Sequence, residues 1–123
     1  MIKAALVLAV HEGRGLLLKR GADAPLQPDD WAVPGGHVDD GEDTIDAGIR
    51  ELEEETGIVS HDLQFLEHAT TKHGMSVAVY KAEVSNKDVR LSYEHTEFGW
   101  FTSRDMPEQT GPISIRLLRE HCP

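Results

Sequence analysis

Four glutamates lie within five residues of this chain, at positions 51, 53, 54 and 55. On a helix with 3.6 residues per turn, Glu51, Glu54 and Glu55 share one face, whereas Glu53 points away from it. Like charges placed so closely destabilise a helix unless a cation offsets them. Carboxylate oxygens at this density are ligands that suit Mg²⁺ and Mn²⁺. The cluster therefore predicts a divalent-metal site on one face of a helix.

The glutamates belong to a longer pattern, which begins in a glycine-containing segment, residues 31–36, that reads WAVPGG. The positions that carry the pattern are Gly36, Glu42, Arg50, Glu51, Leu52, Glu54, Glu55, Gly57 and Ile58. Their spacing resembles the Nudix box, the loop–helix–loop signature of Nudix hydrolases, and every defining position matches. Residues 95–101, which read HTEFGWF, are similar to a late strand of that family. The resemblance covers most of the chain, although only the box is specific.

The resemblance implies an α+β fold, the Nudix α/β/α sandwich, with a mixed central sheet and the loop–helix–loop. The first helix should cover one face of the sheet and the last helix the other. We expect residues 1–123 to form a single Nudix hydrolase domain, because a chain of this length has room for only one domain.

The resemblance also implies a reaction, in which water attacks phosphorus in a nucleoside diphosphate linked to some other group. Such chemistry depends on positioning and on neutralising charge at phosphate oxygens. The implied metal ligands are Glu54, Glu55, Glu51 and the carbonyl of Gly35. Arg50 is expected to fold back and orient Glu51. The base is either Glu51, our first choice, or a glutamate of a later loop, for which we favour Glu97 over Glu94.

Other residues are predicted to contact the substrate. Lys19 and Arg20, at the end of an expected strand, are candidates for binding phosphate oxygens, although Arg20 is also typical of a solvated strand end. Trp31 and Trp100 are candidates for stacking on a base, and packing is the competing interpretation for both.

The most favoured substrate is a nucleoside or deoxynucleoside triphosphate, including oxidised forms such as 8-oxo-dGTP, cleaved to a monophosphate and pyrophosphate. A second hypothesis is hydrolysis of ADP-ribose, a nucleotide sugar, a dinucleotide polyphosphate or a capped RNA end. A third, of another class, is a non-catalytic nucleotide-binding sensor. Sensors of this kind tend to lose box glutamates, and none is lost here.

Composition narrows the class of protein further. The net charge of −10 argues against binding to duplex nucleic acid, which requires a basic face. No apolar run is long enough to span a membrane. The single cysteine, Cys122, excludes an internal disulfide, so a reducing cytoplasm is the expected location. The sequence leaves monomer and homodimer equally open.

Hydropathy patterns predict the elements that must position these residues. Expected strands cover residues 2–10, 15–20, 31–33, 63–70, 75–84 and 98–102, and expected helices cover 43–56 and 113–121. In the first helix, Asp43 or Thr44 is expected to cap the start, and Ile45, Ile49 and Leu52 to form the buried stripe. Gly48 should cost about 1 kcal/mol of helix propensity, which close packing against the sheet would explain. Residues 21–30 and 85–96 are expected to be loops.

Overall fold

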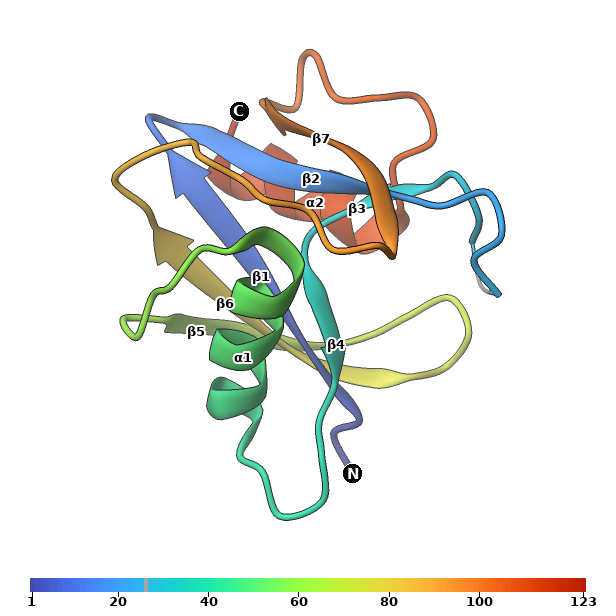
Figure 1. Ribbon diagram of the computed structural model, residues 1–123, viewed down its shortest axis with the longest axis vertical. Coiled ribbons are helices and arrows are strands. Elements are labelled where there is room, and N and C mark those ends of the chain that lie inside the picture. The colour runs from blue at the N-terminus through green and yellow to red at the C-terminus, as the bar shows by residue number, and fades with distance from the viewer. Residues whose placement is uncertain (26) are drawn as a thin grey trace.

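The computed structural model describes residues 1–25 and 27–123, in which seven strands form one mixed sheet between two helices (Figure 1). The strands are β1 (Ala4–His11), β2 (Arg14–Arg20), β3 (Trp31–Ala32), β4 (Gly35–His37), β5 (Gln64–Thr70), β6 (Ser76–Glu83) and β7 (His95–Phe101). The helices are α1 (Thr44–Thr56) and α2 (Pro112–His121). Position 26, within the expected loop 21–30, lies outside the described residues.

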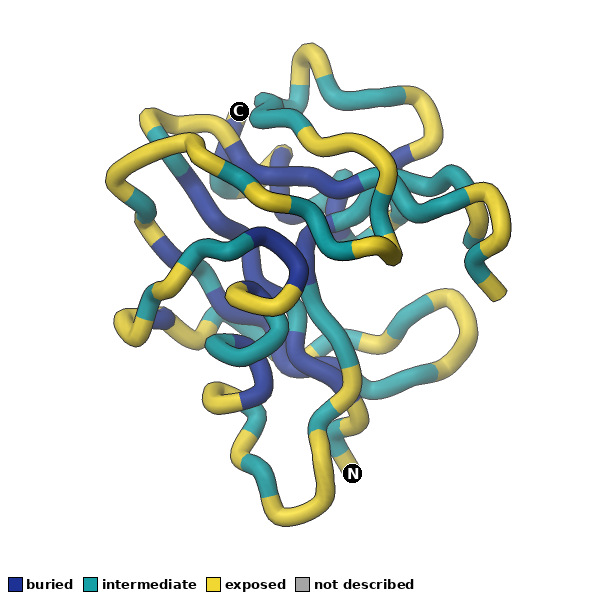
Figure 2. Tube along the Cα trace, in the orientation of Figure 1, coloured by how far each residue is buried: buried dark blue, intermediate teal, exposed yellow. Residues whose placement is uncertain are grey.

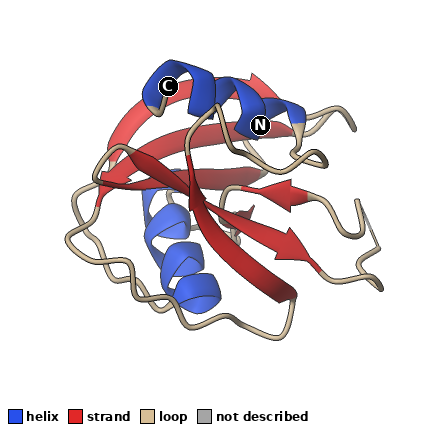
Figure 3. Ribbon diagram, turned by 90° about the horizontal axis from the view of Figure 1, so that it is seen from above, coloured by secondary structure: helices blue, strands red, loops and turns tan. Residues whose placement is uncertain are grey.

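The strand order is β3-β2-β1-β6-β5, with β4 also pairing β1 and β7 also pairing β2. Strands β1 and β6 are parallel, and the other pairs are antiparallel. Seen from above, α2 covers one face of the sheet and α1 the other (Figure 3). The predicted α+β sandwich with a mixed sheet is therefore confirmed.

Side chains alternate between the two faces of the central strands, as the two-residue period of a strand requires. On β1, Ala5, Val7 and Ala9 pack on the α1 side, whereas Ala4, Leu8 and Val10 pack on the α2 side. The two buried layers run along the same central strands, which form the dark blue part of the tube in Figure 2. Both helices thus anchor on a sheet that is apolar on both faces.

Two strands differ from their predicted form. Residues 35–37 were expected in a glycine turn but form strand β4, which pairs with β1 in the register Ala5↔Gly36. The missing side chain at Gly35 makes this possible, because a Cβ there would lie 2.4 Å from the Ala5 carbonyl oxygen. Strand β7 spans the residues that resemble the family's late strand, His95–Phe101, and begins before residue 98, where hydropathy placed its start, because its pairing with β2 continues past a register shift to Arg20↔His95.

Helix α1 buries only part of the predicted stripe, of which Leu52 is fully buried. Ile45 is 36% exposed and Ile49 is only partly buried; the buried positions are Ala47, Gly48, Leu52, Glu55 and Thr56. Gly48 explains this orientation, because a Cβ there would lie 3.1 Å from Leu63 Cδ2 and 3.2 Å from Val7 Cγ2. The close approach at Gly48 brings Glu55 onto the buried face of the helix.

The ends of α1 follow the sequence only in part. Asp43 is the N-cap residue, but no side chain caps the helix, and the Thr44 hydroxyl instead bonds the Tyr80 hydroxyl at 2.6 Å. The predicted side-chain cap is therefore wrong. At the other end Gly57 adopts φ 77°, a left-handed conformation that favours glycine, and its N–H donates to the Glu53 carbonyl.

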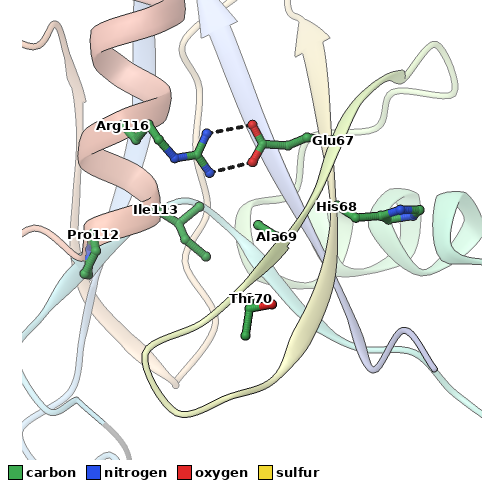
Figure 4. Close-up of a pocket in the computed structure, with 7 residues that line it drawn as sticks. All are labelled: Glu67, His68, Ala69, Thr70, Pro112, Ile113 and Arg116. Atoms are coloured by element: carbon green, nitrogen blue, oxygen red, sulfur yellow. Dashed lines mark hydrogen bonds and ion pairs between the residues drawn. The ribbon is translucent and has the colours of Figure 1, made fainter.

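Helix α2 is joined to the edge strand β5 by a two-pronged ion pair. The Arg116 guanidinium donates to both carboxylate oxygens of Glu67, with Nη1 at 2.7 Å from Oε2 (Figure 4). Arg116 lowers the pKa of Glu67 below its ordinary value.

Neither described helix is long and apolar enough to cross a membrane.

Candidate functional site

The two central strands separate at one end and leave a cleft. Strands β1 and β2 pair only beside their hairpin, at Val10↔Gly15 and His11↔Arg14. Farther along, β1 pairs with β4 while β2 pairs with β3 and β7. A cleft of about 920 Å³ opens here, lined by β4, the carboxylates of α1, the loop after β2, the β5–β6 turn and residues 93–96. The topology of the sheet therefore places the predicted metal-binding helix beside a space large enough for a ligand.

Glu55 is the most buried carboxylate of the site, at 6% exposure. Its Oε1 accepts a hydrogen bond of 2.9 Å from the N–H of Gly35. Burial raises its pKa to about 8, the Gly35 hydrogen bond opposes this shift, and the charges of Glu51 and Glu94 add to it. The charge of Arg20 lowers the pKa of Glu55 but does not offset the effect of burial.

Glu51 lies next to Glu55 and is partly buried. Burial raises its pKa, and the neighbouring Arg50 opposes that shift. The side chain packs directly on the backbone of Gly36, where an added Cβ would lie 2.4 Å from Glu51 Cδ. Glycine at position 36 therefore provides the space that Glu51 occupies.

Arg50 connects the carboxylates of the loop–helix–loop. Its Nη1 lies 2.9 Å from Glu51 Oε1 and 3.2 Å from Glu54, and its Nε lies 2.9 Å from Glu42. The hydrogen bond from Arg50 lowers the pKa of Glu42 to about 2. Arg50 Nη2 also donates to the His37 carbonyl at 3.0 Å. Arg50 thus folds back along the helix and holds Glu51 in place.

The backbone of Gly35 faces the carboxylates. The N–H of Val7 donates to the Pro34 carbonyl and the N–H of Val38 donates to the Lys3 carbonyl, so alternate residues of this segment bond β1. In an antiparallel strand the intervening residues direct both backbone groups to the other side. Accordingly the Gly35 N–H bonds Glu55, and the Gly35 carbonyl lies on the same side, within the cleft lining.

The donor set fits a hard divalent cation in chemistry. Within residues 1–25 and 27–123, no three His, Cys, Asp or Glu side chains are gathered closely enough to hold a metal ion as they stand. The Arg50 guanidinium occupies the space between Glu51 and Glu54. The oxygens that can hold a cation are those of Glu51, Glu54, Glu55 and the Gly35 carbonyl. Burial raises the pKa of Glu51 and of Glu55, so a cation beside them would favour their ionised forms.

Several residues that the sequence nominated lie away from the cleft. Lys19 pairs with Glu97 across β2 and β7, with Nζ and Oε2 3.3 Å apart, and neither residue lines the cleft. Their positions on adjacent strands direct them to each other. Of the two predicted phosphate-binding residues, only Arg20 lines the cleft.

Both tryptophans pack elsewhere in the protein. Trp31 meets Phe101 edge to face, with ring centroids 5.6 Å apart. Trp100 lies 6.1 Å from the His11 ring, and its indole N–H donates to the Lys87 carbonyl. Neither residue lines the cleft. Both tryptophans therefore lie where the packing interpretation placed them.

The structure brings other residues to the cleft that sequence reasoning ranked lower or missed. Glu94 lines it, and its charge raises the pKa of both Glu51 and Glu55. Tyr93 also lines it, as do Leu6, Met75 and Val77, which form an apolar wall. The alternation of β1 and β6 was the available signal for that wall, but only the splayed sheet leaves these residues facing a cleft.

Comparisons with known proteins bear on the family and the fold of the chain. A family model described as NUDIX domain matches residues 2–121. The asymmetrical bis(5'-nucleosyl)-tetraphosphatase of Rattus norvegicus is 39% identical over 79 residues, which are 57% of this chain and 54% of that protein. The chain thus spans about half the length of that curated relative.

Two further similarities cover more of the chain. The asymmetrical bis(5'-nucleosyl)-tetraphosphatase of Caenorhabditis elegans is 34% identical over 113 residues, covering 85% of this chain and 82% of that protein. The crystal structure of a MutT NUDIX hydrolase from Burkholderia pseudomallei is similar with a TM-score of 0.84 at 29% identity, covering 100% of this chain and 99% of that chain.

Proposed function

Because the chain belongs to the Nudix family, we propose that it hydrolyses a nucleoside diphosphate linked to a further group, with a divalent cation as cofactor. Glu51, Glu54, Glu55 and the Gly35 carbonyl would hold the cation. The observation that carries this proposal is the buried Glu55, whose pKa is raised to about 8 at the edge of a cleft rich in carboxylates. A bound cation would supply charge neutralisation at phosphate oxygens and activation of water.

The residues of the chain then have distinct tasks. Glu51 is the proposed proton acceptor for the attacking water, and Arg50 positions it through the 2.9 Å ion pair. Arg20, which also lines the cleft, binds phosphate oxygens. Water adds to phosphorus as one P–O bond of the anhydride breaks, and the leaving phosphate carries away the electron pair of that bond. Glu94 replaces Glu97 as the alternative base, because Glu94 lines the cleft and Glu97 does not.

A dinucleoside polyphosphate is the substrate class that we place first. Support comes from the nematode relative, which is named for this activity and matches 85% of the chain. The volume of the cleft, about 920 Å³, also suits a ligand larger than a mononucleotide. A nucleoside or deoxynucleoside triphosphate, the substrate favoured by sequence alone, is the second candidate. Its support is the similarity over the whole chain to a structure described as a MutT hydrolase.

Glu54→Gln tests the metal-dependent reaction. We expect turnover to fall by about a hundredfold or more, because the amide removes a charged ligand while keeping the shape of an exposed side chain. Circular dichroism should show an unchanged fold, and Glu53→Gln, one residue away on another face, should retain activity. Activity that survives both Glu54→Gln and EDTA on every substrate would contradict the proposal.

A substrate panel separates the candidates within the proposal. It contains diadenosine polyphosphates, ordinary and oxidised deoxynucleoside triphosphates, ADP-ribose and nucleotide sugars, with products identified by chromatography. We expect the highest kcat/KM for diadenosine tetraphosphate. Nucleotide binding without release of any phosphorylated product would instead support the sensor hypothesis.

A further inference from the structure

Tyr93 stands at the cleft with almost no contact to the rest of the protein. Its exposed fraction is 96%, and it lines the cleft between Ser92 and Glu94. Among the described cleft-lining residues it is the one phenylalanine, tyrosine or tryptophan. The two tryptophans, which were candidates for stacking on a base, are packed elsewhere. The smaller rings of His37, His73 and His95 also line the cleft, but Tyr93 offers the largest flat aromatic surface among the described lining residues.

The backbone around Tyr93 is held on both sides. The N–H of Ser92 donates to the Glu55 carbonyl at 3.3 Å, which connects the segment to the end of α1. The carbonyl of Glu94 accepts from the N–H of Gly21 at 3.2 Å, which connects it to the end of β2. The N–H of His95 closes the turn onto the Ser92 carbonyl at 3.3 Å. The ring thus projects from a backbone that is fixed relative to both Glu55 and Arg20.

The charges of the cleft constrain how a nucleotide lies in it. Glu51, Glu54 and Glu55 form an acidic side, where a phosphate chain carrying a divalent cation fits. A nucleobase is uncharged and gains no electrostatic stabilisation beside these glutamates. It should therefore lie away from the acidic side. The exposed ring of Tyr93 has the properties of a stacking platform, because every nucleobase has a π-face that an aromatic side chain can cover.

We propose that Tyr93 stacks on a nucleobase of the substrate and so determines how tightly the substrate binds. This inference rests on the proposed function, because it assigns a further contact to the same cleft. Stacking of one base on one aromatic side chain raises affinity roughly 5- to 100-fold, and a contact on one exposed side belongs to the lower part of that range. The contact forms equally in the ground state and in the transition state, so it acts on KM and not on kcat.

The first test is steady-state hydrolysis of diadenosine tetraphosphate by Tyr93→Ala and Tyr93→Phe. We expect Tyr93→Ala to raise KM about 5- to 30-fold with kcat within about twofold of the wild type. Tyr93→Phe keeps the ring and should match the wild type. Phe98→Ala is the control, because Phe98 is 41% exposed on β7 and does not line the cleft. An unchanged KM for Tyr93→Ala, or an equal loss for Tyr93→Phe, would overturn the stacking role.

The second test measures stacking directly, through the binding of a fluorescent nucleotide. Binding of 1,N6-etheno-ATP with Mg²⁺ should quench the fluorescence of the etheno-adenine ring in the wild type and in Tyr93→Phe, and the quenching should disappear in Tyr93→Ala. Inorganic tripolyphosphate with Mg²⁺, which has no base, should bind wild type and Tyr93→Ala with the same affinity. Weaker tripolyphosphate binding in Tyr93→Ala would show disturbance of the phosphate site and refute the assignment.

These measurements separate the two proposals. If the wild type hydrolyses no nucleotide but Tyr93→Ala still loses quenching, the proposed function fails and the stacking assignment stands. If nucleotides are hydrolysed and Tyr93→Ala behaves as the wild type in both tests, the stacking assignment fails and the proposed function stands.

Discussion

The three glutamates on one face of α1 occupy three different environments. Glu54 is exposed, Glu51 is partly buried, and Glu55 is buried, with 6% of its surface exposed. The difference arises because the helix rotates toward the sheet at Gly48 and carries Glu55 inward. The free-energy cost of ionisation therefore differs among the three glutamates. Substitutions of these residues should differ in their effects on activity and on stability.

Gly36→Ala should displace Glu51, because the new Cβ would lie 2.4 Å from Glu51 Cδ. We expect kcat/KM to fall at least about tenfold, since a catalytic group moved by about 1 Å loses much of its effect. Gly111→Ala is the matched control, because its Cβ meets nothing closer than 3.8 Å and the residue lies outside the cleft. Equal activity of Gly36→Ala and the wild type would show that the position of Glu51 is not critical.

Glu55→Gln should stabilise the metal-free protein while abolishing activity. The folded pKa of about 8 lies above the ordinary value of 4.5, so the contribution of Glu55 to stability is full below pH 4.5 and is lost as the pH rises through 8. The amide avoids that loss and still accepts the hydrogen bond from Gly35. In EDTA at pH 9, urea unfolding should show a gain on the order of a few kcal/mol, because each unit of the difference between the two pKa values contributes about 1.4 kcal/mol.

The pH series supplies the control for this prediction. At pH 4 the carboxyl is protonated in both folded and unfolded states, so Glu55→Gln and the wild type should unfold at the same urea concentration. A variant that is less stable than the wild type at pH 9 would show that the buried carboxylate is satisfied without a cation.

Among the elements, the sheet decides where chemistry is possible. Strands β1 and β2 separate beyond their hairpin; there β4 pairs with the edge that β1 leaves free, and β3 pairs with the edge that β2 leaves free. The cleft is therefore built into the strand order, and α1 reaches it because Gly48 and Gly36 allow close approach. On the far face, α2 is held to β5 by Arg116 and Glu67, away from the cleft.

Glu67→Gln tests how much that ion pair contributes. The pKa of Glu67 is lowered by Arg116, so its stabilisation is present above the unfolded value of 4.5 and is lost as the pH falls through the lower folded value. Both side chains are partly exposed, so we expect a loss of only about 0.5 to 1 kcal/mol at pH 7. Thermal unfolding at pH 7 and pH 2 measures this difference, which should vanish at pH 2; a difference that persists there would indicate lost packing instead of lost charge.

At the scale of the whole molecule, a net charge of −10 and an acidic cleft act in the same direction. The excess of negative charge opposes the compact state and attracts divalent cations more strongly than monovalent ones. Duplex nucleic acid is an unsuitable partner for such a surface. The charge distribution therefore predicts that cations stabilise the fold as well as supporting the reaction.

Millimolar Mg²⁺ should raise the melting temperature of the wild type by about 5 °C, because a ligand that binds only the folded state stabilises it. NaCl at equal ionic strength should have a much smaller effect. Differential scanning fluorimetry with Mg²⁺ and Mn²⁺ measures the shift, and Glu53→Gln should respond as the wild type. An equal shift in Glu54→Gln would place the stabilising cation elsewhere on the acidic surface.

The sequence determined the parts of this protein that depend on neighbours along the chain. The helix of residues 44–56, its left-handed end at Gly57 and the shared face of Glu51, Glu54 and Glu55 follow from local periodicity and spacing. The α+β class followed from the order of apolar segments together with the Nudix box. Those features need few long-range contacts, so local pattern was enough.

Only the tertiary structure decided which distant residues meet at the cleft. Lys19 pairs with Glu97 because β2 pairs with β7, and Trp31 and Trp100 pack because their strands turn them onto other rings. Tyr93 and Glu94 reach the cleft because backbone bonds to Glu55 and Gly21 place their turn there. Strand pairing and the separation of β1 from β2 depend on contacts between residues that are far apart in the sequence. The spacing of residue types along the chain does not specify these contacts.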